Sequence, residues 1–128
     1  EFNHSQENGL HFLQIWIEPA QRGISPSYEQ KAFPTAERQG QWSLVASQDG
    51  RDGSVGVNQD VNLYASLLSA GDQLAAPTSR HAWLHVVKGA VEVNGETLRT
   101  GDAAAFTPSE DVALACTEAS EVLLFDLA

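Results

Sequence analysis

The sequence predicts an all-β domain, an antiparallel barrel or sandwich with at most one or two short helical turns. Apolar residues recur at every second position along most of the chain, as in strands, and the 3.6-residue period of helices is nearly absent. Turn-forming residues interrupt the alternation at short intervals, at residues 48–54, 69–72, 94–95 and 100–102. Many short strands separated in this way are typical of sandwiches and barrels.

The central hairpin is predicted by VVKGAVEVNGETLRTGDAAAFTP, residues 86–108. Asn94 and Gly95 both tolerate positive φ, which a two-residue type I′ turn requires. This turn fixes a register in which Val91 pairs with Leu98, and the two side chains share the inward face. The stretch therefore predicts two short strands joined by a tight turn.

Three further stretches predict strands by their alternation. They are VNLYASLL at residues 61–68, VALAC at 112–116 and EVLLFDL at 121–127. Gly89 and Gly101 are expected at points where the backbone bends between strands. These elements belong to residues 40–128, which we expect to form the barrel.

The first third of the chain has a different pattern. A strand is predicted from HFLQIWIEP, residues 11–19, with Leu13, Ile15 and Ile17 on one face and Phe12 and Trp16 on the other. A strand that is apolar on both faces is covered on both sides or awaits a partner. Residues 18–34 hold three prolines and little alternation, so we expect a wrapping loop. A single helical turn capped by Thr35 is expected at residues 35–39.

Composition excludes several classes of protein. The 128 residues suit one domain, and the net charge of -10 with only seven scattered Lys and Arg excludes a nucleic-acid partner. No apolar stretch approaches membrane-spanning length, and no signal peptide is visible. The single Cys116 excludes an internal disulfide, which fits a reducing, cytoplasmic setting, and its alternating context predicts a buried, inert thiol. Because the chain begins at Glu1 and contains no Met, we expect a fragment or a processed product.

The order of several stretches resembles a known fold. RHAWLHVVKGAVEVNG, ETLRTGDAAAF and SEVLLFDL follow one another as in cupins, whose fold is a jelly-roll-like antiparallel β-barrel. The resemblance becomes more specific with three further stretches, HFLQIWIEP, GISPSYEQKAF and SQDGRDGSVGVNQDVNLYASLL. Together these stretches look like the C-terminal half of the pirin-like bicupins, a family that includes quercetin 2,3-dioxygenase-type enzymes. The resemblance implies a single C-terminal cupin domain over residues 1–128, with residues 1–35 at the junction with an N-terminal cupin.

The resemblance also implies where the metal of the family lies. That metal, for which we expect iron, sits in the N-terminal barrel on three histidines and a glutamate. In this register Glu1 matches the glutamate, as a ligand only in the complete protein. One carboxylate does not hold a transition metal, which needs three or four converging ligands.

The general cupin pattern further predicts that this barrel binds no metal of its own. The pattern places H-x-H and then a glutamate ahead of the glycine that begins the hairpin. Counting back from Gly89, the glutamate position falls on Ala82 and the two histidine positions fall within AAPT, residues 75–78. The last histidine would follow Pro108, where SEDVAL supplies none. We therefore expect no cofactor and no catalytic residue in this chain.

Other metal arrangements have weaker support. His81 and His85 lie on one strand face about 13 Å apart, too far to chelate one ion, so we expect an exposed or half-buried stripe that includes Trp83. A site at His4 and His11 remains a minor alternative. The Asp-Gly pairs at residues 49–50 and 52–53 lack the calcium-loop spacing and are interpreted as turns.

Our leading hypothesis is a metal-free C-terminal cupin that serves as a structural half of a larger enzyme. In the complete protein the resemblance implies metal-dependent dioxygenation of a flavonol such as quercetin. We expect Phe12, Ile15 and Trp16 to form the interface with the N-terminal half, or a homodimer contact through residues 11–17 when that half is absent. The alternative is a non-catalytic binding module for a protein partner or small ligand. A self-sufficient enzyme is the third hypothesis.

Overall fold

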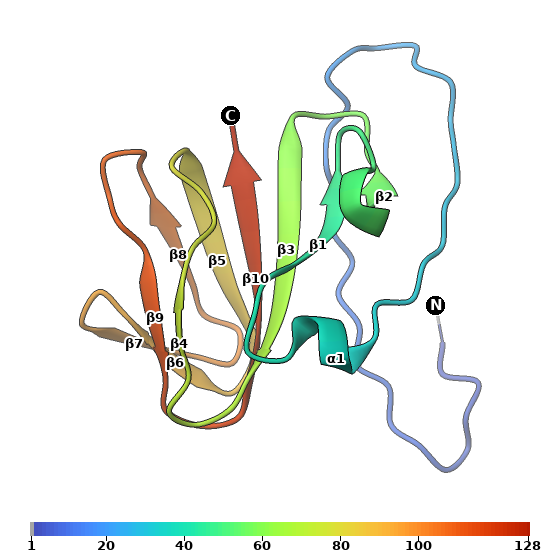
Figure 1. Cartoon of the computed structure of the whole chain (residues 1–128). Helices are drawn as coiled ribbons and strands as arrows, with labels where there is room; N and C mark the ends of the chain where they lie inside the picture. The colour runs from blue at the N-terminus through green and yellow to red at the C-terminus, as the bar shows by residue number, and fades with distance from the viewer. Residues whose placement is uncertain (1) are drawn as a thin grey trace.

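The computed structural model describes residues 2–128 and contains two β-sheets that pack face to face (Figure 1). Ten strands lie within these residues: β1 (Ser43–Ser47), β2 (Val55–Gly56), β3 (Val61–Leu68), β4 (Gln73–Ala75), β5 (His81–Lys88), β6 (Ala90–Val93), β7 (Glu96–Arg99), β8 (Ala103–Phe106), β9 (Ala113–Cys116) and β10 (Ser120–Leu127). One sheet has the order β2-β1-β3-β10-β5-β8 and the other β4-β9-β6-β7. The predicted all-β, jelly-roll-like fold is confirmed.

Within residues 2–128, helical structure is limited to two short elements, α1 (Thr35–Arg38) and η1 (Arg51–Gly53). The predicted helical turn is present, but its predicted cap is wrong. Pro34 occupies the N-cap position, Thr35 is already helical, and no side chain caps the end. In the part of the chain that the structure describes, no helix has the length and apolar character to cross a bilayer.

The core lies between the two sheets and follows from the alternation of the long strands. Leu84 and Val86 of β5, and Val122 and Leu124 of β10, are fully buried, and the facing sheet contributes Val91. Burying a Val or Leu side chain stabilises a fold by roughly 1.5–3 kcal/mol. The alternate residues of β5 and β10 point away from this core, toward the outer face of the six-stranded sheet.

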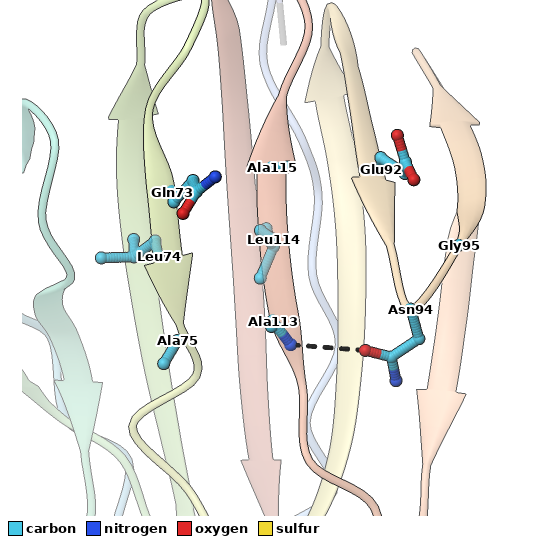
Figure 2. A pocket seen from close by; sticks show the side chains of 9 residues that line it. All are labelled: Gln73, Leu74, Ala75, Glu92, Asn94, Gly95, Ala113, Leu114 and Ala115. Atoms are coloured by element: carbon cyan, nitrogen blue, oxygen red, sulfur yellow. Dashed lines mark hydrogen bonds between the residues drawn. The ribbon is translucent and has the colours of Figure 1, made fainter.

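The central hairpin has the predicted register. Val91 pairs with Leu98, and Asn94 and Gly95 have positive φ of 49° and 87°. The Asn94 side chain also ties the hairpin tip to the next strand, because its Nδ2 donates to the carbonyl of Asp111 at 2.9 Å. Its Oδ1 accepts from the amide of Ala113 at 3.5 Å (Figure 2).

Gly89 marks a corner that no other residue fits. It has a φ of 98°, and an added Cβ would lie 2.2 Å from Ser120 Oγ and 2.5 Å from the carbonyl oxygen of Ala119. The close approach lets Ser120 Oγ accept from the amide of Ala90 at 3.0 Å. The β5–β6 corner is thereby joined to the start of β10.

The N-terminal arm, residues 2–34, contains neither helix nor strand, so the strand predicted over residues 11–19 is wrong for this structure. A strand needs a neighbour to complete its ladder of hydrogen bonds, and alternation alone supplies none. In Figure 1 the arm passes behind β1 and returns to α1, and its Leu13 and Ile15 line a cavity with Trp83 and Phe125 on the outer face of the sheet. Val61, Leu63 and Ala65 are buried on this side, outside the main core cluster.

Candidate functional site

The outer face of the six-stranded sheet is the first candidate site. In the register of β3, β10 and β5, Leu63, Phe125 and Trp83 form a row across the sheet and face away from the core. Leu63 is buried, whereas Trp83 is 45% exposed. The outer face is therefore apolar across three strands and is only partly covered.

The arm is fastened to the barrel beyond residue 17. Four hydrogen bonds make this attachment: Ala20 N to Asn58 O at 2.8 Å, Gln59 Nε2 to Glu18 O at 3.0 Å, Lys31 Nζ to Ser54 O at 2.8 Å, and Gly56 N to Glu29 Oε1 at 3.1 Å. Within the described residues, none joins residues 2–17 to the barrel. The apolar part of the arm is held by side-chain contact alone.

The arm and the sheet together form an apolar surface. Leu13 and Ile15 line a cavity of about 230 Å³ with Trp83, His85, Leu123 and Phe125 of the sheet. The three residues predicted for the interface are exposed: Phe12 by 51%, Ile15 by 42% and Trp16 by 87%. Sequence reasoning missed the contribution of Trp83, although the outward positions of HAWLHVV and EVLLFDL already carry apolar residues on this face.

The four histidines do not assemble into a metal site within residues 2–128. His81 is exposed and His85 half-buried on the same strand face as Trp83, as the predicted stripe requires. His4 packs against Phe2, with ring centroids 4.4 Å apart. Over residues 2–128, no group of three or more His, Cys, Asp or Glu side chains is placed to hold a metal ion. Glu1, matched to a metal ligand by resemblance, lies outside the described residues.

The second candidate is the interior at one end of the barrel, where the cupin pattern would place metal ligands. Ala82, at the expected glutamate position, is buried and pairs with Asp126 on one side and Phe106 on the other. Thr78, from the stretch expected to carry the histidine pair, donates its hydroxyl to Asp126. Of the sequence-derived ligand positions, Ala82 and Thr78 therefore lie together beside Asp126, whereas Ala75 is exposed.

Asp126 is the centre of a buried polar network. Its carboxylate accepts from Arg80 Nε at 3.0 Å and from Asn62 Nδ2 at 2.7 Å, in addition to Thr78. The same arginine uses Nη1 to bind both carboxylate oxygens of Asp60 at 2.9 Å. These groups come from the start of β3, the loop before β5 and the end of β10, so the network fastens three segments together.

Asp126 is ionised in the fold despite its burial. Burial raises the pKa of this carboxyl, but the hydrogen bonds from Arg80, Thr78 and Asn62 outweigh that effect, so the pKa lies below its ordinary value. The hydrogen bond to Asp126 is likewise the largest cause that raises the pKa of Arg80, with Asp60 adding to it. The pair is charged across the neutral range.

The residues at this end do not fit a bound transition metal. Such a metal prefers histidine and thiolate ligands, and Ala82 and Thr78 offer neither at the two positions that converge here. Asp126 and Asp60 are already engaged by the Arg80 guanidinium, whose positive charge opposes a cation. The Arg80 guanidinium, and not a metal ion, therefore balances the two carboxylates at this end of the barrel.

The outer face of the four-stranded sheet carries a shallow groove (Figure 2). Ala75, Ala113 and Ala115 lie along it, and Gln73 and Glu92 add polar side chains. No nucleophile with an adjacent base stands among its lining residues. Cys116 of β9 is buried on the other side of this sheet, in the core, as predicted.

Comparison with known proteins identifies the family. Residues 44–127 match the family model described as the quercetinase C-terminal cupin domain. The chain belongs to this family. As a cupin domain it is 42% identical to a quercetin 2,3-dioxygenase of Escherichia coli strain K12, over 99% of this chain and 54% of that protein. It is 39% identical to a putative quercetin 2,3-dioxygenase of Pasteurella multocida, over 99% of this chain and 55% of that protein.

Solved structures agree with this assignment. The cupin domain superposes on the crystal structure of YhhW from Escherichia coli with a TM-score of 0.80 and 39% identity, over 88% of this chain and 48% of that chain. It superposes on the nickel(II) complex of the bacterial pirin YhhW with a TM-score of 0.76 and 40% identity, over 85% and 47% of the two chains. The chain spans about half the length of the curated relatives it matches.

The family match and the alignments cover different parts of the chain. The family model begins at residue 44 and so describes the barrel, whereas the alignments with relatives extend over 99% of the chain and include the arm. The arm is therefore shared with these relatives.

Proposed function

We propose that this cupin domain is the non-catalytic C-terminal half of a two-cupin protein, and that its arm and outer sheet face dock the N-terminal cupin. The exposed apolar surface of Phe12, Ile15, Trp16 and Trp83 carries the proposal. The network around Asp126 supports a structural role, because Asp126 and Asp60 are both already paired with Arg80. The twofold greater length of the relatives leaves room for a second barrel.

The energetics favour covering this surface. Complete burial of an aromatic side chain removes 150–250 Å² from water, roughly 4–6 kcal/mol at about 25 cal/mol per Å² before entropic costs. Trp16 is 87% exposed and Phe12 is 51% exposed, so much of that gain is still unrealised in the chain alone. An N-terminal barrel seated on this face would realise it.

For the complete protein we propose metal-dependent dioxygenation of a flavonol such as quercetin. The metal, iron by the family resemblance, would lie in the N-terminal barrel with Glu1 among its ligands. The relatives named quercetin 2,3-dioxygenase and the nickel(II)-bound pirin support a metal enzyme of this type. The present half would cover the active barrel and shape its entrance, in a reducing, cytoplasmic setting that suits the free Cys116.

The test measures association of this chain with a separately produced N-terminal half by calorimetry. Phe12→Ser combined with Trp16→Ser should weaken binding at least tenfold, because buried aromatic residues dominate interface energies. Tyr28→Ser is the matched control, an 83% exposed aromatic of the same arm outside the proposed contact. Equal binding by both variants would refute the docking surface.

Metal analysis of the complete protein tests whether the N-terminal half binds the metal and residues 40–128 serve a structural role. The His ligands and Glu1 should account for all bound metal, so Glu1→Ala should reduce metal content and quercetin consumption together. Asp126→Asn should leave both unchanged in the folded protein. Stoichiometric metal bound inside residues 40–128 would contradict the proposed structural role.

When the N-terminal half is absent, we propose that two copies cover each other through residues 11–17. Exposed apolar segments with unpaired backbone commonly associate in this way. Sedimentation should show a dimer for the chain and a monomer for the Trp16→Ser variant. A monomeric unsubstituted chain at high concentration would exclude this contact.

The cavity of about 230 Å³ between the arm and the sheet favours a second candidate function, a binding module for a small apolar ligand. Enlarging Leu13 to Trp should then abolish ligand uptake and leave docking of the N-terminal half intact. This alternative would be rejected if the unsubstituted chain bound no small apolar ligand and the Leu13→Trp variant lost docking of the N-terminal half.

A further inference from the structure

We infer that the seam between β7 and β8 binds an extended basic segment of another protein, which adds as a strand to the β8 edge. This inference is independent of the proposed docking of the N-terminal half. It rests on three observations: two unpaired strand edges that face one seam, an apolar slot between them, and a rim of carboxylates.

The seam exists because consecutive strands belong to different sheets. β7 ends the four-stranded sheet, β8 ends the six-stranded sheet, and residues 100–102 join them without any pairing between the two. Among the described strands, β7 pairs only with β6, and β8 pairs only with β5. Each strand therefore presents one free edge on the same side of the barrel.

The free edge of β8 has hydrogen-bonding groups available. The amide of Val86 donates to the carbonyl of Asp102 at 2.9 Å, which fixes the phase of the ladder between β5 and β8. In an antiparallel pair the bonded residues alternate, so Ala104 and Phe106 bond to β5 while the amides and carbonyls of Ala103 and Ala105 point outward. Edges of this kind usually carry Lys, Pro or a bulge, and the four residues of β8 carry none of these.

Beside this edge lies an apolar slot. A cavity of about 320 Å³ is lined by Val93 and Leu98 on one side and by Ala104 and Phe106 on the other. Leu98 and Ala104 are half-buried and pack against the core cluster. An apolar side chain of an added strand would extend the core here.

The rim of the slot is acidic. Glu96 and Glu110 line it, and Lys and Arg are absent from its lining residues. Glu96 forms no ion pair among residues 2–128, and Glu110 accepts only from the amide and hydroxyl of Thr107, at 2.6 and 3.2 Å. With a chain charge of -10, this rim favours a cationic partner segment. The matching occupant is an extended peptide that alternates basic and apolar residues.

The test titrates the 128-residue chain with a short capped peptide of alternating lysine and valine, followed by NMR amide shifts. Shifts should concentrate on residues 96–98 and 103–110, and binding should weaken as salt is raised. A peptide of alternating glutamate and valine is the control and should bind at least tenfold more weakly. Shifts confined to residues 11–17, or equal binding of the two peptides, would overturn the inference.

Two sets of variants separate the contribution of the carboxylates to peptide binding from that of strand addition at the β8 edge. Glu96→Gln combined with Glu110→Gln should weaken lysine-peptide binding at least tenfold and flatten its salt dependence. Ala105→Pro should block strand addition without removing a bond to β5, because the Ala105 amide faces outward, and Ala105→Ser is its matched control. Unchanged binding in a folded Ala105→Pro protein would overturn strand addition even if the carboxylate variants behave as expected.

Discussion

The barrel and the arm use similar apolar patterns with opposite results. β10 alternates apolar residues, has a paired strand on each edge, and buries Leu124 completely. Residues 11–17 are at least as apolar, yet they form no ladder and leave Trp16 87% exposed. Apolar alternation thus shows that a strand is possible, and a neighbouring edge decides whether it forms. The barrel strands pair with one another and bury their apolar side chains, whereas the arm keeps apolar side chains that another surface can cover.

The largest expected effect comes from breaking the barrel at its tightest corner. Gly89→Ala should destabilise the chain by about 2–5 kcal/mol, because it combines left-handed strain with collision against Ser120 and the Ala119 carbonyl. Gly95→Ala is the matched control, with a similar φ of 87° but open space around its Cβ, and should cost about 1–2 kcal/mol. Urea unfolding measures both. Equal losses of unfolding free energy in the two variants would mean that the β5–β6 corner shifts to accommodate the added methyl group.

The next effect concerns the network that fastens three segments of the barrel. Asp126→Asn should cost about 1.5–3 kcal/mol near neutral pH, the usual range for hydrogen bonds to charged groups. The pKa of Asp126 is lowered in the fold, so its ionised form contributes stability above the ordinary carboxyl pKa of about 4. That contribution is lost as the pH falls through the lower folded-state pKa.

Urea unfolding across the acidic range checks the sign of this effect. The difference in unfolding free energy between the unsubstituted chain and Asp126→Asn should be constant near neutrality and should shrink below about pH 4. A difference that grows on acidification would show that the carboxyl is protonated in the fold.

The smallest effect is expected in the arm. Trp16→Ser should change the unfolding free energy of the monomeric chain by less than about 0.5 kcal/mol, as for other exposed positions. Trp42→Ser is the barrel counterpart and should cost more than about 1 kcal/mol. It removes a hydrogen bond of 2.8 Å from Nε1 to the Ala75 carbonyl and an edge contact with Tyr64. Similar losses for the two would show that Trp16 is packed against the barrel in solution.

Local features of the fold were predictable because few residues determine them. Asn94 and Gly95 specify their turn, and the turn specifies the pairing of Val91 with Leu98. The absence of a strand at residues 11–19 was not predictable, since it depends on whether any edge in the folded chain is free beside it. Thr35 was misassigned because Pro34, already extended, occupies the cap position.

The site was predictable only in part. Counting from Gly89 pointed to Ala82 and residues 75–78, of which Ala82 and Thr78 lie beside Asp126 whereas Ala75 lies on the outer groove. The network itself was not foreseen, since Asn62, Thr78 and Asp126 are far apart in sequence and each is ordinary in its own segment. The exposure of Phe12 and Trp16 was expected, but the position of Leu13 and Ile15 against the outward residues of β5 and β10 emerges only when the sheet order is known.

The place of β10 also constrains the order in which the domain is made. This last strand lies between β3 and β5, and its residues pair with partners that are synthesised long before them. Until β10 leaves the ribosome, β3 and β5 have no common neighbour and the six-stranded sheet is divided in two. The six-stranded sheet therefore assembles only after β10 has been synthesised, when Asp126 joins Asn62 and Arg80 in the polar network.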